Sequence, residues 1–119
     1  MHRWLRILRA GPAALCGFPM LLAAPPAAAN EQRLLAYGKH LSGECSSCHR
    51  IDGIDNGIPS IVGWSTEDFI ATLEFYRNGS RPNPAMVSVA KSLDDDQVKA
   101  LAAYYASLPK PPKRSSATR

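Results

Sequence analysis

Two cysteines and a histidine stand together in the run Cys45-Ser46-Ser47-Cys48-His49. Two thiols separated by two residues can each add to one vinyl group of a haem, and a histidine directly after the second thiol can take an axial position on the iron. A short turn between the cysteines would place both thiols along one porphyrin edge and leave the imidazole beneath the ring. The spacing therefore predicts one covalently bound c-type haem on Cys45 and Cys48, with His49 as an iron ligand.

The same residues have two competing interpretations. A redox-active Cys-x-x-Cys pair normally lies at a helix start beside a strand, with a lowered thiol pKa, but no alternation of strands and helices is visible here. A tetrahedral zinc site could combine the two cysteines with His49 and His40. Adjacent residues 48 and 49 are awkwardly placed for one metal, however, and the usual separated second pair of ligands is absent. Haem attachment is the favoured interpretation.

The first residues of the chain have the pattern of an export signal. Arg3, Arg6 and Arg9 form a basic start, an apolar stretch covers residues 10–24, and three alanines at 27–29 provide small residues for cleavage. This order is typical of a secretory signal peptide. We therefore expect a signal over residues 1–29 and a periplasmic location for the rest of the chain.

The first residues have two alternative interpretations, a membrane span and a lipoprotein signal. A membrane span needs about 20 uninterrupted apolar residues, but prolines and glycines interrupt this stretch. Cys16 would suit a lipoprotein signal, but the bulky Leu15 precedes it where a small residue is expected. Hence we expect no stable membrane insertion after cleavage.

The charge of the chain gives little reason to expect a nucleic-acid partner. The formal net charge is +4, but three of the 14 basic residues lie in the predicted signal, which leaves 11 basic against 10 acidic residues. No basic face with interleaved aromatic residues is visible. The mature chain of about 90 residues is near the size at which an apolar core is only just sufficient, so a buried haem would supply the missing core.

The apolar pattern predicts an all-α domain over residues 30–109. A first helix over 31–41 carries Leu34, Tyr37 and Leu41 on one face, with Gly38 marking a close approach of another helix. Residues 50–64 form a loop whose isoleucines need something apolar to cover. A second helix over 65–78 begins with the capping pair Ser65 and Asp68, and its predicted buried stripe is Phe69, Leu73 and Tyr76.

The last helix, over residues 94–108, starts with Asp94 and Gln97 in the spacing of a capping box. We expect its apolar face to cross the first helix at Gly38, with Pro109 ending it. Residues 110–119 are predicted to be a disordered tail. The predicted apolar face is Val98, Leu101, Tyr105 and Leu108, with Ala102 small enough for close contact.

The second axial position on the iron has two candidate ligands after the signal is removed, Met86 and His40. His40 lies on the stretch leading into the attachment turn and would have difficulty reaching the opposite face of the ring, so Met86 is favoured. Met86 follows Pro84, which fits the first turn of a short helix. The carbonyl of Pro59 is a candidate acceptor for the His49 ring proton.

Arginines provide candidate partners for the haem propionates. Guanidinium groups bind carboxylates with two parallel hydrogen bonds, and Arg77 and Arg81 follow one another closely near the end of the second helix. Ordinary solvated charge is the alternative for both.

Three motifs together resemble the class I monohaem cytochromes c, over residues 30–108. They are Phe75-Tyr76-Arg77-x-Gly79-x-Arg81, then Asn83-x-x-Met86, then Leu93-Asp94-Asp95 leading to Leu101-Ala102-Ala103-Tyr104-Tyr105. They look most like small periplasmic bacterial cytochromes and the cytochrome subunits of flavocytochrome c sulfide dehydrogenases. The resemblance implies about four helices around one haem, with the first and last helices crossed and the haem held between His49 and Met86.

The resemblance and the residues together favour a periplasmic one-electron carrier rather than an enzyme, since no catalytic nucleophile or acid–base pair stands out. Expected partners are redox proteins such as a flavoprotein dehydrogenase or a terminal oxidase. Two rivals remain at this stage: the haem subunit of a flavoprotein that oxidises sulfide, and a gas-binding or catalytic haem with an open sixth site.

Overall fold

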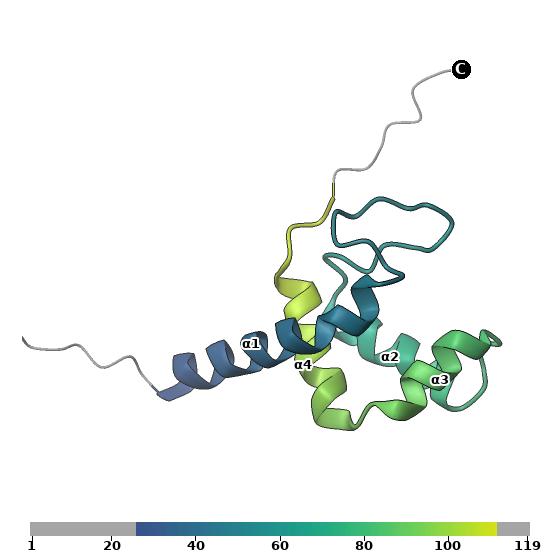
Figure 1. Ribbon diagram of the computed structural model, residues 1–119. Coiled ribbons are helices and arrows are strands. Elements are labelled where there is room, and N and C mark those ends of the chain that lie inside the picture. The colour runs from purple at the N-terminus through teal and green to yellow at the C-terminus, as the bar shows by residue number, and fades with distance from the viewer. Residues whose placement is uncertain (1–25, 112–119) are drawn as a thin grey trace, which may run out of the picture.

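The computed structural model describes residues 26–111 as an arrangement of four α-helices (Figure 1). They are α1 (Pro26–Ser46), α2 (Thr66–Arg77), α3 (Pro84–Ser92) and α4 (Asp95–Ser107), and no strand occurs within this range. The prediction of an all-α fold is confirmed. None of the helices in the described range is both long and apolar enough to cross a membrane.

The predicted signal and tail lie mostly outside the described residues. Of the signal, only residues 26–29 fall inside, where they form the first turn of α1. Of the tail, residues 110 and 111 are described, and they have no regular structure. Cys16, the candidate lipoprotein cysteine, also lies outside the described part.

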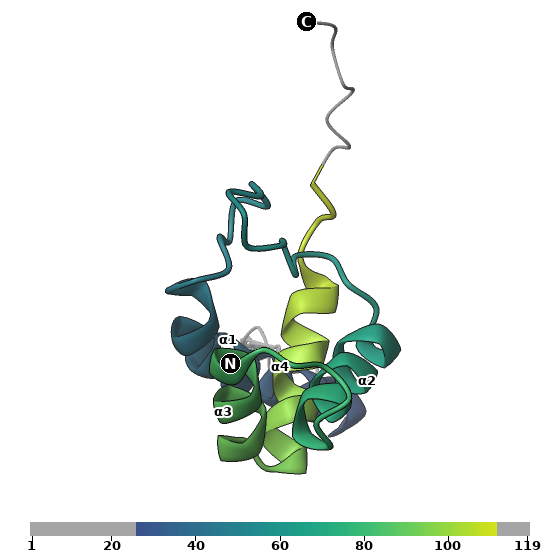
Figure 2. The same cartoon turned by 90° about the vertical axis from the view of Figure 1, so that its right-hand side faces the viewer.

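Helix α1 crosses α4, as both views of the ribbon show (Figures 1 and 2). Gly38 is buried at this crossing, and a Cβ atom added there would lie 2.6 Å from the carbonyl carbon of Ala100 and 2.7 Å from Cβ of Tyr104. Only glycine permits so close an approach. The prediction that Gly38 marks the crossing of the first and last helices is therefore confirmed.

The apolar face predicted for the first helix is wrong at Leu34 and Tyr37, whereas Leu41 is partly buried against the core. Leu34 and Tyr37 are 39% and 43% exposed, whereas Gly38 and Ser42 are the buried residues of α1. The reason is the close crossing: small residues allow the two backbones to approach, and the larger apolar side chains then lie beside the contact rather than in it. The helix also continues to Ser46, so Cys45 belongs to its last turn.

The core is formed mainly by α4 and α2. Phe69 and Leu73 of α2 are buried as predicted, and the Phe69 ring stacks on Tyr105 with 5.6 Å between centroids. The loop between α1 and α2 contributes Ile61 and Val62. The buried residues of α4 are Val98, Ala100, Leu101, Ala102 and Tyr105, which include three of the four predicted on its apolar face.

Side-chain caps fix where the helices begin. The Ser65 hydroxyl accepts a hydrogen bond from the Asp68 amide at 3.1 Å, and a complete capping box joins Asp94 and Gln97. Both caps were predicted. Helix α3 begins with Pro84 after the cap residue Asn83, which matches the prediction of a short helix starting at this proline.

Candidate haem site

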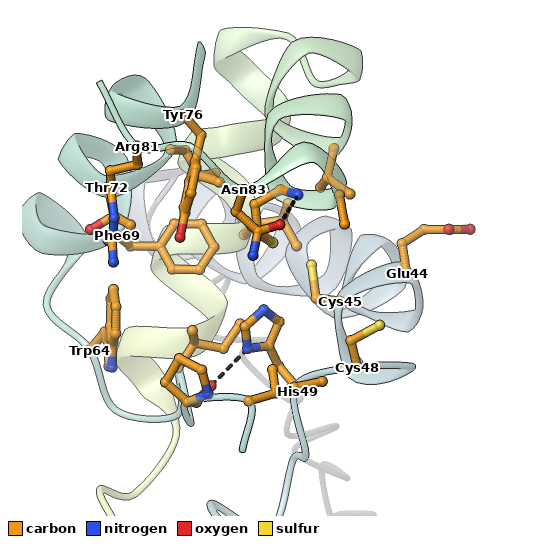
Figure 3. Close-up of a pocket in the computed structure, with 18 of the residues that line it drawn as sticks. Glu44, Cys45, Cys48, His49, Trp64, Phe69, Thr72, Tyr76, Arg81 and Asn83 are labelled. Atoms are coloured by element: carbon orange, nitrogen blue, oxygen red, sulfur yellow. Dashed lines mark hydrogen bonds between the residues drawn. The ribbon is translucent and has the colours of Figure 1, made fainter. Parts of the chain in front are cut away.

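A cavity of about 270 Å³ lies between the end of α1, the loop after it, α2 and α3. Its walls are mostly apolar, and they include both cysteines of the attachment motif together with His49 and Met86. Figure 3 shows Cys45 and Cys48 on one side of this space and Trp64, Tyr76 and Arg81 on the other. Residues predicted from separate parts of the sequence therefore meet at one cavity.

The attachment turn follows directly from the end of α1. The amides of Cys48 and His49 both donate to the carbonyl of Cys45, at 3.2 and 2.8 Å. This turn brings both sulfur atoms to the same side of the cavity. The arrangement suits two thioether bonds to one porphyrin edge.

The competing interpretations of the cysteines are not supported by this geometry. Burial raises the pKa of the Cys45 thiol, whereas a redox-active dithiol needs a lowered one. Among residues 26–111, no group of three or more His, Cys, Asp or Glu side chains is arranged to hold a metal ion. The zinc site that would have used His40 is therefore not formed.

His49 is buried, and its ring is held by a backbone carbonyl of the loop that follows it. The Nδ1 atom lies 2.7 Å from the carbonyl oxygen of Pro59 (Figure 3). A carbonyl can only accept, so Nδ1 donates its proton here, and in the neutral imidazole Nε2 then carries the lone pair. The structure thus contains the Pro59 contact that the sequence suggested, and it leaves one imidazole nitrogen free to bind a metal.

Met86 lines the same cavity from the first turn of α3. The Asn83 side chain accepts a hydrogen bond from the Met86 amide at 3.1 Å, which fixes the backbone of that turn. Figure 3 shows His49 and Asn83 on opposite sides of the space. His40 is exposed and does not line the cavity. Of the two candidate sixth ligands, Met86 lines the cavity and His40 does not.

The two arginines occupy different places. Arg81 lines the cavity, with its guanidinium carbon 4.9 Å from the centroid of the Tyr76 ring. Arg77 does not line it. All three nitrogens of its side chain donate elsewhere: Nε to Ala90 O at 2.9 Å, Nη2 to Leu93 O at 2.6 Å, and Nη1 to Asp95 Oδ1 at 2.7 Å. Arg81 therefore stays a candidate partner for a propionate, and Arg77 has a different set of contacts.

Two residues of the site were missed in the sequence. Trp64 and Asn83 both line the cavity. Trp64 ends the loop whose isoleucines had already indicated an apolar neighbour, and a large aromatic at that end was a usable signal. Asn83 precedes a proline and is the cap of α3, which places its side chain beside Met86.

The residues present fit a covalently bound haem. Two cysteines lie along one side, His49 and Met86 line the same space, and the rest of the wall is largely apolar. An arginine lies on the side away from the cysteines, where a carboxylate would need a partner. These features define a protein that carries one haem of the c type.

Comparison with known proteins agrees with this class, although no family model matches the chain. The chain is 33% identical over 79 residues to cytochrome c-554(548) of Halomonas halodenitrificans, covering 60% of this chain and 93% of that protein. It is 36% identical over 74 residues to the cytochrome subunit of sulfide dehydrogenase of Chlorobaculum tepidum, covering 61% and 67% of the two chains.

A third relative is much longer. The thiosulfate dehydrogenase electron acceptor of Stutzerimonas stutzeri is 36% identical over 70 residues, which cover 55% of this chain but only 32% of that protein. The chain therefore spans about a third of this relative's length. The protein belongs to the small c-type cytochromes. It has an all-α fold, and membership of this family implies a covalently bound haem c.

Proposed function

We propose that this cytochrome is an exported, periplasmic one-electron carrier whose haem is attached through Cys45 and Cys48 and ligated by His49 and Met86. The observation that carries the proposal is that His49 and Met86 line one cavity, with His49 on the side opposite the cap of α3. The carrier domain is residues 30–109. When bound, the haem supplies the one-electron cycle between ferrous and ferric iron.

The chain controls the two axial ligands through short local contacts. The Pro59 carbonyl holds the proton on Nδ1 of His49 and fixes the orientation of the ring. The Asn83 cap holds the first turn of α3 and with it the backbone of Met86. A thioether opposite an imidazole favours the ferrous state and raises the reduction potential.

The mostly apolar walls of the cavity would exclude water from a bound haem and contact its ring. Phe69, Leu73 and Leu101 line it and are almost fully buried. Arg81 lines the cavity and would hold one propionate of a bound haem, because a guanidinium group can donate two parallel hydrogen bonds to a carboxylate. If His49 and Met86 both ligated the iron of a bound haem, no position would be left there for a substrate, so this ligation would favour electron transfer over catalysis at the iron.

The partners in this proposal are redox proteins, for example a flavoprotein dehydrogenase or a terminal oxidase. Electron-transfer encounters use small interfaces, so we expect a weak complex. The relative from Chlorobaculum tepidum is named as a subunit of sulfide dehydrogenase, and this favours a second candidate function, the cytochrome subunit of a flavoprotein sulfide dehydrogenase. Stable copurification with a flavin-containing protein would support that candidate over a free carrier.

The test of the proposed ligation is the absorption spectrum of the oxidised and reduced holoprotein. We expect the native protein to show a sulfur-to-iron charge-transfer band when ferric and to resist carbon monoxide when ferrous. Met86→Ala should lose the band and bind carbon monoxide readily. His40→Ala is the matched control and should keep both native properties. An unchanged band in Met86→Ala would exclude Met86 as the ligand.

A further inference from the structure

The helix that carries Met86 has few connections to the rest of the protein. Helix α3 has nine residues, and a helix of that length is unstable by itself in water. Among the helices of the described range, α3 packs against α2 and does not approach α1 or α4 closely. The position of Met86 therefore depends on what fixes α3 to α2.

Arg77, the last residue of α2, makes this connection. Its Nε donates to the carbonyl of Ala90 and its Nη2 to the carbonyl of Leu93, the cap residue at the end of α3. The carbonyls in the last turn of a helix have no partner within the helix, and a cation there also interacts favourably with the helix dipole. The side chain of Arg77 is only 22% exposed, so these bonds are largely shielded from water.

The contact at Ala90 bears directly on Met86. Residues four apart in a helix lie on the same face, one turn above the other, and Ala90 is four residues after Met86. Ala90 is fully buried, and Met86 is partly buried on the cavity. A shift of Ala90 relative to α2 would therefore move Met86 relative to the cavity.

Other hydrogen bonds do not replace this connection. The Asn83 cap joins only neighbouring residues to the first turn of α3. Within residues 26–111, the hydrogen bonds that join α3 and Leu93 to another helix are the two from Arg77. The remaining nitrogen of this side chain, Nη1, forms an ion pair with Asp95 at the start of α4 at 2.7 Å and lies 3.6 Å from the Glu74 carboxylate of its own helix.

We propose that Arg77 is a positioning residue for the Met86 ligand: its guanidinium group joins the end of α2 to the end of α3 and so holds the thioether at the cavity. This inference rests on the proposed His49 and Met86 ligation. It assigns Arg77 a role different from the propionate contact that its place in the sequence suggested.

The experiment is a titration of the ferric holoprotein with imidazole, which binds the iron only when the thioether leaves. Arg77→Met removes two hydrogen bonds from a charged donor, so the thioether should leave the iron more readily and imidazole should bind more tightly. We expect the apparent Kd of imidazole to fall at least about ten-fold in this variant. Arg77→Lys keeps the charge but cannot donate to both carbonyls with the geometry of a guanidinium group. The Kd of imidazole should therefore fall by an intermediate amount in this variant. Asp95→Asn, which removes only an exposed ion pair, should stay within about two-fold of the native value.

The outcomes separate the positioning role from the proposed ligation. A native protein without the sulfur-to-iron band would show that the ligation itself is wrong. A native protein with the band, together with an unchanged imidazole Kd in Arg77→Met, would overturn the positioning role, as would a lowered melting temperature without a change in Kd. If Arg77→Met gives no folded holoprotein, Arg77→Lys decides: a native Kd in that variant also overturns the proposal.

Discussion

At Gly38, where α1 crosses α4, tertiary packing and helix propensity predict opposite effects of an alanine substitution on the stability of the protein. Gly38→Ala adds one methyl group where the carbonyl carbon of Ala100 and the Cβ of Tyr104 already lie within 2.7 Å of the new atom. These neighbours are backbone or close to it and cannot turn aside. The two helices must therefore separate, and this disturbs the most buried helix of the core.

The expected magnitude follows from two opposing effects. Overpacking of a tight site costs about 3 kcal/mol at the upper end of its usual range, while replacing a helical glycine with alanine stabilises the helix by about 1 kcal/mol. The net loss is about 2 kcal/mol. In a domain of this size that corresponds to a fall in Tm of about 8–16 °C, measured on the holoprotein by circular dichroism at a helical wavelength.

Gly43→Ala is the matched control, because Gly43 lies in the same helix and has nothing within 4 Å of the added atom. Only the propensity effect acts there, so this variant should be more stable than the native protein by up to about 1 kcal/mol. If Gly38→Ala melts at the native temperature or above, the close crossing is not what the glycine provides, and the reasoning fails.

Three further predictions concern the core, the cavity and the loop. The double variant Cys45→Ala, Cys48→Ala cannot attach haem and should be largely unfolded by circular dichroism, because the cavity lies within a chain whose core is only just sufficient; a cooperative thermal transition without haem would contradict this. Tyr105→Phe should lose no more than about 1 kcal/mol in chemical unfolding, because the sulfur of Cys45 is the hydrogen-bond partner indicated for the buried hydroxyl and sulfur accepts only weakly; a larger loss would mean that the hydroxyl has a stronger partner. Finally, a hydrogen bond from Arg50 lowers the pKa of Asp52 to about 2. The ionised Asp52 carboxylate therefore stabilises the native protein fully above its ordinary pKa near 4, and this contribution is lost as the pH falls through about 2. The native protein and Asp52→Asn should accordingly differ in stability at neutral pH and converge below about pH 2.

The parts of this protein that depend on short stretches of sequence could be predicted. The capping pairs at Ser65 and Asp94 involve residues three apart, and the structure contains both. The attachment motif is contiguous, and its cysteines and histidine reach one cavity. Such features follow from local geometry, which the order of residue types specifies without knowledge of the rest of the fold.

Features set by the packing of distant segments were harder to predict. The apolar side chains of Leu34 and Tyr37 indicated the wrong buried face of α1, because the separation of two crossing helices depends on the smallest residues at the contact and not on the most apolar ones. Gly38 carried the correct signal. A pattern of apolar residues reports burial only when the partner helix is far enough away to admit large side chains.

Arg77 and Arg81 show how far residue type alone can lead. Both are arginines four residues apart, and both were candidates for a propionate. The end of α2 separates them: Arg77 is the last helical residue, and its side chain reaches the end of α3, while Arg81 follows the left-handed turn at Gly79 and reaches the cavity. One arginine therefore contacts the helix that bears a proposed ligand, and the other lies at the cavity itself. The two should accordingly differ in effect, with loss of Arg77 changing how firmly Met86 is held and loss of Arg81 changing the charge beside the haem.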